Sequence, residues 1–175
     1  MNEDFLNKNV GSTYTVSDLE TKPTKKSPTA PFTTSTLQQE AARKLYLPVG
    51  ITMQLAQRLY EAGLITYMRT DSVNLSKDAM EAAQAEIIKS YGQEFSKPRS
   101  FVNKSKGAQE AHEAIRPTDM SRHTVNIDRD QARLYDLIWK RTVQSQMSTA
   151  IFDVLTTHIN YKQNKTDNIY ISIQL

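Results

Sequence analysis

Hydrophobic residues recur at helical spacing through the central part of the chain. Leu or Ala stands at every fourth position from 37 to 45, which predicts a helix over residues 35–46 that ends before Pro48. Its N-cap is expected at Ser35 or Thr36, since each is followed by Gln three residues later. A second pattern, over residues 52–62, predicts a helix that ends at a glycine. The short connection favours an antiparallel or helix-turn-helix pair, which either packs in a core or docks in a groove of DNA.

Two further helices are predicted on the same basis. Ser76 is a suitable N-cap for a helix that ends at Gly92, with Asp78 in its first turn. Asp128 is expected to cap a long helix whose apolar stripe includes Trp139, which we interpret as a core residue rather than a platform for a DNA base. Between these helices, residues 95–108 form a basic loop that either contacts DNA or is simply exposed.

The two ends of the chain show the alternating pattern of β-strands. Residues 13–16 are β-branched or aromatic, residues 155–161 follow a period of two, and residues 169–175 place their apolar side chains on one strand face. Residues 22–28 contain two prolines and three lysines and are predicted to be a linker. We therefore expect a mixed, mainly α fold, with a helical domain over residues 31–150 inserted between β segments 1–30 and 151–175. Because the chain ends inside an alternating pattern, we expect it to be part of a longer protein.

The amino-acid composition excludes some classes of site but does not identify a function. The 175 residues carry a net charge of +3, which permits nucleic-acid binding but does not require it. Cysteine is absent, which excludes disulfides and thiolate metal sites and is compatible with a reducing cytoplasm. No run of about 18 apolar residues predicts a membrane span, and the N-terminus lacks the features of a signal peptide.

The segment from Gly63 to Ser72 carries the candidate chemistry. If it is extended, a period of two puts Ile65, Tyr67 and Arg69 on one face, with a phenol beside a guanidinium. A phenol can act as a covalent nucleophile, and a guanidinium is a permanently charged clamp for phosphate. The pair suggests phosphodiester chemistry or phosphate binding. The same pattern also fits a strand with a half-buried tyrosine and a surface arginine.

A second candidate lies in residues 109–116, which are predicted to form a short helical turn ended by Pro117. His112 is followed by Glu113, but a zinc-protease helix needs a second His four residues later, and Arg116 stands there instead. A metal site is therefore rejected. On a helical turn, His112 and Arg116 would share one face and suit an anion. A structural histidine is the alternative.

Three segments, in order, resemble a known family. Residues 63–72 (GLITYMRTDS) are similar to the active-site tyrosine segment of bacterial type IA DNA topoisomerases, the topoisomerase I group. Residues 31–41 (PFTTSTLQQEA) resemble the segment that opens the tyrosine-bearing domain of this family. Residues 109–117 (QEAHEAIRP) resemble its histidine segment. The resemblance runs from residue 30 to residue 159, most of the chain.

This resemblance implies a helical, winged-helix-like domain carried on two arms of a β-rich arch domain. It also implies transient cleavage of single-stranded DNA, strand passage and religation, which relax negatively supercoiled DNA without ATP. Tyr67 would form a 5′-phosphotyrosine. Arg69 would stabilise the negative charge, because a phenol with a pKa of about 10 is rarely ionised at neutral pH. The residues expected to bind a phosphate or to organise the site are His112, Thr66, Asp71 and Arg116.

The resemblance further implies parts that this chain lacks. In the family, Mg²⁺ is held by an acidic cluster of a separate TOPRIM domain. No Asp-x-Asp-x-Asp run occurs here, and Asp128 and Asp130 fit a helix cap better than a metal site. We therefore expect no metal ligand or other cofactor site on this chain. The expected partners are DNA and the TOPRIM and arch domains of the same protein, with no membrane. The isolated chain is expected to be inactive or slow, and the protein to lie in the bacterial cytoplasm with the nucleoid.

Two other functional classes are compatible with these residues. The first is a non-catalytic helix-turn-helix module that binds nucleic acid, in which Tyr67 only packs. The second is a tyrosine recombinase or type IB enzyme, which uses Arg, His and Tyr without a metal but forms a 3′-phosphotyrosine. The three segments do not resemble that second family. The sequence does not separate a topoisomerase I from a topoisomerase III in its choice of substrate.

Overall fold

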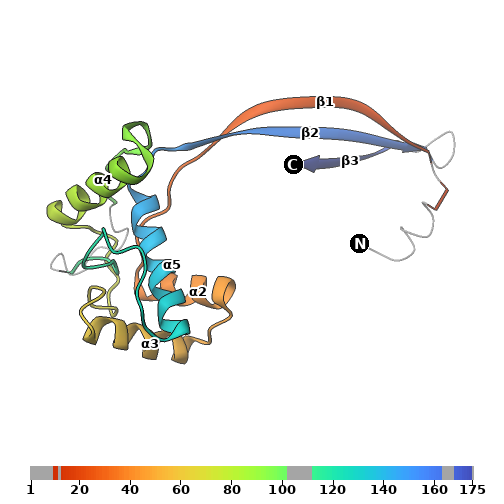
Figure 1. Cartoon of the computed structure of the whole chain (residues 1–175). Helices are drawn as coiled ribbons and strands as arrows, with labels where there is room; N and C mark the ends of the chain where they lie inside the picture. The colour runs from red at the N-terminus through yellow and green to blue at the C-terminus, as the bar shows by residue number, and fades with distance from the viewer. Residues whose placement is uncertain (1–9, 12, 102–111, 163–167, 175) are drawn as a thin grey trace. The chain divides into compact units, whose positions relative to one another are not determined.

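A computed structural model of the protein describes residues 10–11, 13–101, 112–162 and 168–174. The chain divides into two compact units. One contains both ends of the chain, Met1–Lys26 and Ala150–Leu175, and the other is the intervening segment Ser27–Thr149 (Figure 1). None of the helices in the described part of the chain is long and apolar enough to cross a membrane.

The unit formed by the two ends is an antiparallel sheet with the strand order β1-β2-β3. Strand β1 (Thr13–Lys26) pairs along its whole length with β2 (Ala150–Lys162), and β3 (Asn168–Gln174) pairs with the other edge of β2. The predicted linker is therefore wrong for residues 22–26, which continue β1. Pro23 is tolerated there because β1 is an outer strand, where a missing amide need not interrupt the sheet. Residues 163–167, predicted as a turn, lie outside the described residues.

Helices α2 (Thr34–Leu45) and α3 (Val49–Glu61) are joined by a three-residue turn, and both begin earlier than predicted. The N-cap of α2 is Thr33 rather than Ser35 or Thr36. Its hydroxyl accepts a hydrogen bond from the Thr36 amide, and the Thr36 hydroxyl accepts one from the Thr33 amide. Helix α3 starts directly after Pro48, whose carbonyl accepts from the Thr52 amide and whose side chain makes no capping hydrogen bond.

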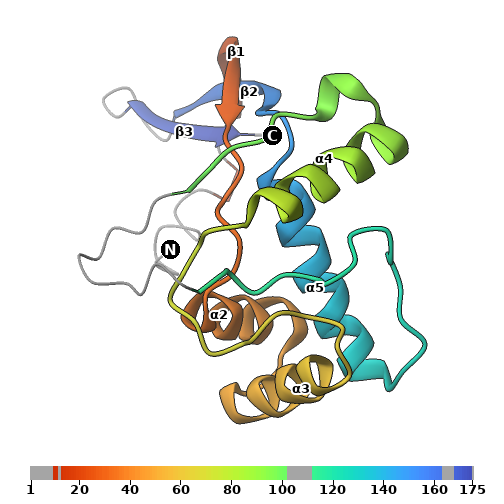
Figure 2. The same cartoon turned by 90° about the vertical axis from the view of Figure 1, so that its left-hand side faces the viewer.

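Helices α4 (Lys77–Tyr91) and α5 (Arg129–Ser145) have the N-caps that the sequence predicts. Ser76 Oγ accepts from the Ala79 amide, and Asp128 Oδ1 accepts from the amides of Asp130 and Gln131. A short 3₁₀ turn, η1 (Gln93–Phe95), follows α4. Helix α5 lies between α4 and the α2–α3 pair in both views (Figures 1 and 2).

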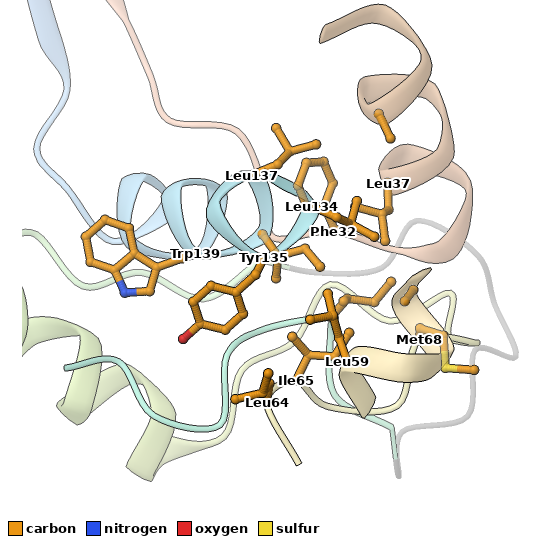
Figure 3. Packing of buried hydrophobic residues seen from close by; sticks show 14 of the residues in the cluster. Phe32, Leu37, Leu59, Leu64, Ile65, Met68, Leu134, Tyr135, Leu137 and Trp139 are labelled. Carbon is orange, nitrogen blue, oxygen red and sulfur yellow. The ribbon is translucent and has the colours of Figure 1, made fainter. Parts of the chain in front are cut away.

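Helix α5 supplies the centre of the hydrophobic core of this unit. Leu134 and Tyr135 are each at most 1% exposed, and Trp139 is buried, as predicted. Figure 3 also labels Leu137 of α5 and the side chains from other elements that gather around this helix: Phe32, Leu37, Leu59, Leu64, Ile65 and Met68. The core therefore holds apolar residues from both sides of Tyr67 in the sequence.

The predicted winged-helix arrangement is not confirmed. A winged helix would need a β-hairpin beside its helix pair. The described residues of the helical unit contain no β-strand, only isolated bridges that join Phe32 to Ile115, Ile65 to Pro117 and Ser96 to Met147. What stands is the coarser prediction, a mainly α unit combined with a small antiparallel sheet.

Candidate active site

Three segments that are far apart in the sequence meet at one place in the helical unit. One isolated bridge joins Phe32, in residues 31–41, to Ile115. A second joins Ile65, in residues 63–72, to Pro117. Both bridges use the segment that follows His112, so that segment holds the other two together. These are the three segments whose sequences resembled a known family.

The tyrosine segment, residues 63–72, is irregular rather than extended. Ile65 and Met68 are each 1% exposed, whereas Tyr67 and Arg69 are exposed. The predicted period of two is wrong for Ile65, which is buried in the core, although burial does alternate from Tyr67 to Ser72 and leaves Tyr67 and Arg69 exposed. The segment starts at Gly63, whose φ of 70° is easily adopted only by glycine. Burial on either side of Tyr67 leaves this side chain 42% exposed at the surface.

The ring of Tyr67 has an aromatic neighbour that sequence reasoning missed. Tyr60, in the last turn of α3, meets it edge to face, with ring centroids 5.3 Å apart and an interplanar angle of 66°. This separation lies in the range that aromatic pairs prefer. The signal in the sequence was the position of Tyr60, one helical turn before the glycine that leads into the tyrosine segment. The contact restricts the directions in which the Tyr67 ring can point.

A pocket of about 380 Å³ brings together Arg69, Asp71 and His112. Its remaining lining comes from Thr70 and from the first turn of α2, residues 33–35. The N-terminus of a helix carries a partial positive charge, and Arg69 adds a permanent one, so the pocket suits an anionic group despite the Asp71 carboxylate. Sequence reasoning selected Arg69, Asp71 and His112 but missed the residues of α2. Their signal was the run of hydroxyl side chains in residues 31–41.

Thr66 joins the tyrosine segment to the histidine segment. Its amide donates to the Arg116 carbonyl at 2.9 Å, and its hydroxyl donates to the Ala114 carbonyl at 2.7 Å. The Arg116 amide returns a hydrogen bond to the Thr66 hydroxyl at 3.0 Å. Thr66 does not line the pocket. Its visible contacts are those of a residue that organises the backbone beside Tyr67.

Residues 112–116 are not helical, so the helical spacing that was predicted to put His112 and Arg116 on one face is absent, and only His112 lines the pocket. The Arg116 guanidinium forms an ion pair with Glu113 at 2.6 Å, and its side chain is only 15% exposed. Burial raises the pKa of Glu113, but hydrogen bonds from Arg116 and Ser76 outweigh it and hold that pKa below its usual value. Residues 109–111 of the predicted turn lie outside the described residues.

The carboxylates and imidazoles of the described residues do not assemble a metal site. Within that part of the chain, no three His, Asp or Glu side chains lie close enough together to hold a metal ion. Asp128 instead caps α5, with both of its hydrogen bonds going to amides of the first turn. The pocket itself is lined by one arginine, one histidine, one aspartate and four residues that carry a hydroxyl group.

Comparison with known proteins identifies relatives that match most of this chain. A sequence model of a family described as DNA topoisomerase matches residues 2–173. A DNA topoisomerase 1 of Zymomonas mobilis is 55% identical over 148 residues, which are 83% of this chain and 12% of that protein. A DNA topoisomerase 1 of Pasteurella multocida is 52% identical over 151 residues, or 83% of this chain and 17% of that protein.

The fold has a solved counterpart as well. The structure of full-length topoisomerase I from Thermotoga maritima superposes with a TM-score of 0.74 at 34% sequence identity. The match covers 99% of this chain and 30% of that one. The chain thus spans between about one eighth and one third of the length of the relatives described here.

Proposed function

Because the chain belongs to the DNA topoisomerase family, we propose that it carries the strand-cleaving tyrosine of a bacterial type IA DNA topoisomerase. The family assignment that the three segments suggested is confirmed by the match over residues 2–173. The observation that supports the function is their convergence, in which an exposed Tyr67 stands two residues from the arginine of a pocket that also contains His112. The substrate is single-stranded DNA, and the protein acts with the nucleoid in the cytoplasm.

In the proposed reaction, Tyr67 Oη attacks the phosphorus of a DNA phosphodiester. A bond forms between the phenol oxygen and phosphorus, and the bond from phosphorus to the 3′ oxygen breaks. The phenol releases its proton, and the departing 3′ oxygen takes one up. A second strand passes through the gap, after which the 3′ hydroxyl attacks the phosphotyrosine and restores both groups. Because one ester is exchanged for another, relaxation of negative supercoils needs no ATP.

The neighbours of Tyr67 serve this chemistry through charge and position. Arg69 stabilises the phenolate and the negative charge that develops on the phosphoryl group. His112 binds a phosphate of the scissile strand in the pocket that it shares with Arg69 and Asp71. Thr66 organises the backbone beside the nucleophile through its hydrogen bonds to Ala114 and Arg116. Arg116 acts through its ion pair with Glu113 rather than through a phosphate.

The proposal also assigns the domains of this chain and of the longer protein to which it would belong. Residues 31–150 are the helical domain that carries the tyrosine, and segments 1–30 and 151–175 are arms of the arch domain. A TOPRIM domain supplies Mg²⁺. The described residues of this chain do not fit that ion, so no step above passes through it.

The test is a chimera in which residues 13–162 replace the matching segment of the Pasteurella multocida relative. The chimera, the 175-residue chain alone, and their variants are incubated with an end-labelled single-stranded oligonucleotide, with and without Mg²⁺, and run on denaturing gels. We expect the chimera to form an adduct through the 5′ phosphate and to relax supercoiled plasmid, and Tyr67→Phe to abolish both. Tyr91→Phe is the matched control, because Tyr91 is similarly exposed but lies at the end of α4.

Each alternative has its own outcome in this experiment. If adduct formation or relaxation survived Tyr67→Phe, the result would support the alternative that this chain is a helix-turn-helix module in which Tyr67 only packs. An adduct through the 3′ phosphate would point to recombinase or type IB chemistry. Relaxation by the 175-residue chain alone would contradict the proposal that the metal-binding domain lies elsewhere.

A further inference from the structure

The first turn of α2 holds the backbone on both sides of Arg69. The Thr34 amide donates to the Thr70 carbonyl at 2.8 Å, and the Thr70 amide donates to Thr34 Oγ1 at 2.8 Å. The Thr34 hydroxyl itself lies 2.8 Å from the Met68 carbonyl and 3.0 Å from the Thr70 carbonyl, and it can donate its proton to either. One threonine side chain therefore serves the residue before Arg69 and the residue after it.

The position of Arg69 depends on these backbone hydrogen bonds, because few other interactions fix its side chain. In the described part of the chain the guanidinium forms no ion pair, and residues 67–72 belong to no helix or strand whose ladder would fix them. Backbone groups in such a segment must find partners elsewhere, and here Thr34 supplies them for Met68 and Thr70.

We propose that Thr34 is a positioning residue for the reaction: it fixes the backbone of residues 68–70 so that the Arg69 guanidinium lies in the pocket. The inference rests on the proposed roles of Tyr67 and Arg69. Thr34 lines the pocket, but its hydroxyl proton goes to the Met68 or the Thr70 carbonyl, so Thr34 acts through Arg69 rather than on DNA and its loss slows cleavage more than it weakens binding. A misplacement of about 1 Å in a catalytic group can reduce a rate by about a hundredfold.

The matched substitutions are Thr34→Val, which keeps the shape of the side chain but removes its hydroxyl, and Thr34→Ser, which keeps the hydroxyl. In the chimera we expect Thr34→Val to lower the rate constant for adduct formation at saturating oligonucleotide by about tenfold to a hundredfold. The dissociation constant of the oligonucleotide should change much less, and Thr34→Ser should restore most of the rate. Thr142→Val is the control, because the buried Thr142 hydroxyl donates to the Ile138 carbonyl within α5 and touches no part of the site.

A double-mutant cycle separates positioning from general destabilisation. In an Arg69→Ala background, Thr34→Val should have little further effect on the rate, because the group that it positions has gone. Equal effects of Thr34→Val in both backgrounds would overturn the proposal, as would a rate that is unchanged by Thr34→Val while Tyr67→Phe abolishes the adduct. A failure of the proposed function itself shows up separately, as an adduct that survives Tyr67→Phe.

A second measurement uses the 175-residue chain without any activity. The Thr70 amide lies outside helices and strands, yet its hydrogen bond to Thr34 should slow its hydrogen exchange. We expect this protection to be lost in Thr34→Val and kept in Thr34→Ser, with circular dichroism confirming that each variant is folded. Should Thr34→Val fail to fold, Thr34→Ala takes its place in both assays. A Thr70 amide that exchanges equally fast in the unsubstituted chain and in Thr34→Val would contradict the role given to the hydrogen bond between Thr70 and Thr34.

Discussion

Tyr46 combines backbone strain with unusual exposure. It follows α2 with a φ of 58°, the left-handed conformation, and its side chain is 87% exposed. For a residue with a Cβ this conformation costs about 1–2 kcal/mol, which is why glycine is common just after a helix. The neighbouring Leu47 is buried, so the turn into α3 is held by the core although Tyr46 itself contributes little to it.

We predict that Tyr46→Gly stabilises the helical unit by about 1 kcal/mol, because glycine removes the steric cost at this φ. Urea unfolding of the 175-residue chain, followed by circular dichroism at 222 nm, measures the change. Ala42→Gly is the control, since Ala42 is exposed within α2 and glycine there should cost about 0.5–1 kcal/mol. A loss of stability in Tyr46→Gly would mean that the exposed ring makes stabilising contacts.

At the scale of elements, a buried carboxylate joins α4 to the loop that precedes α5. Glu86 of α4 is 5% exposed and lies 2.6 Å from Nε2 of His123, whose ring packs on Trp139 of α5 with centroids 4.5 Å apart. Ser90 also donates to the same carboxylate. Burial raises the pKa of Glu86, but the hydrogen bonds from Ser90 and His123 outweigh it, so the pKa lies below its usual value.

The direction of this pKa shift predicts how stability depends on pH. Because the pKa of Glu86 is lower in the folded chain than in the unfolded chain, the carboxylate stabilises the fold above its unfolded pKa of about 4.3. That contribution is lost as the pH falls through the folded pKa. We expect Glu86→Gln to cost about 1–3 kcal/mol at pH 7 and progressively less towards pH 3. Urea unfolding across this range measures the difference.

Glu81→Gln is the control for that series. Glu81 is exposed on the same helix, and its nearest cation is Lys77 at 3.7 Å, an exposed pair that contributes little. The Glu81 variant should therefore follow the unsubstituted chain at every pH. A penalty for Glu86→Gln that stayed constant from pH 7 to pH 3 would show that the carboxylate charge does not contribute to this junction.

At the scale of the whole molecule, the helical unit is self-contained. Every residue of its main hydrophobic cluster lies between Phe32 and Met147, inside the unit Ser27–Thr149. The strands of the other unit pair with one another, and β1 pairs with β2 along its whole length. The helical unit therefore contains its own hydrophobic core, and the strands of the other unit form their backbone hydrogen bonds with one another.

We predict that residues 27–149, produced alone, fold cooperatively. Far-ultraviolet circular dichroism should show the helices, and thermal unfolding should give one transition within about 5 °C of the helical unit in the whole chain. The reason is that cutting at residues 26 and 150 removes no member of the main hydrophobic cluster. A broad, non-cooperative transition would show that the strands are needed to complete the helical core.

Local sequence signals determined the features that depend on neighbours along the chain. The caps at Ser76 and Asp128, the glycine after α4, the strand character of the two ends and the burial of Trp139 all follow from residue types at short spacing. The three segments that resemble the family were also identified from the sequence, and they contain the candidate residues Tyr67, Arg69 and His112. Helix starts shifted by one to three residues, because Thr33 and Pro48 are better suited to those positions than the residues expected there.

The tertiary structure alone decided how these residues are used. Burial of Ile65 and Met68 in a core built by α5 turned an expected strand into an irregular segment that leaves Tyr67 exposed. Hydrogen bonds between Thr34 and Thr70, and between Thr66 and Ala114, hold that segment in place. The Arg116 guanidinium forms an ion pair with Glu113. The physical reason is that periodicity and capping are local, whereas core packing and backbone pairing between distant segments depend on the path of the whole chain.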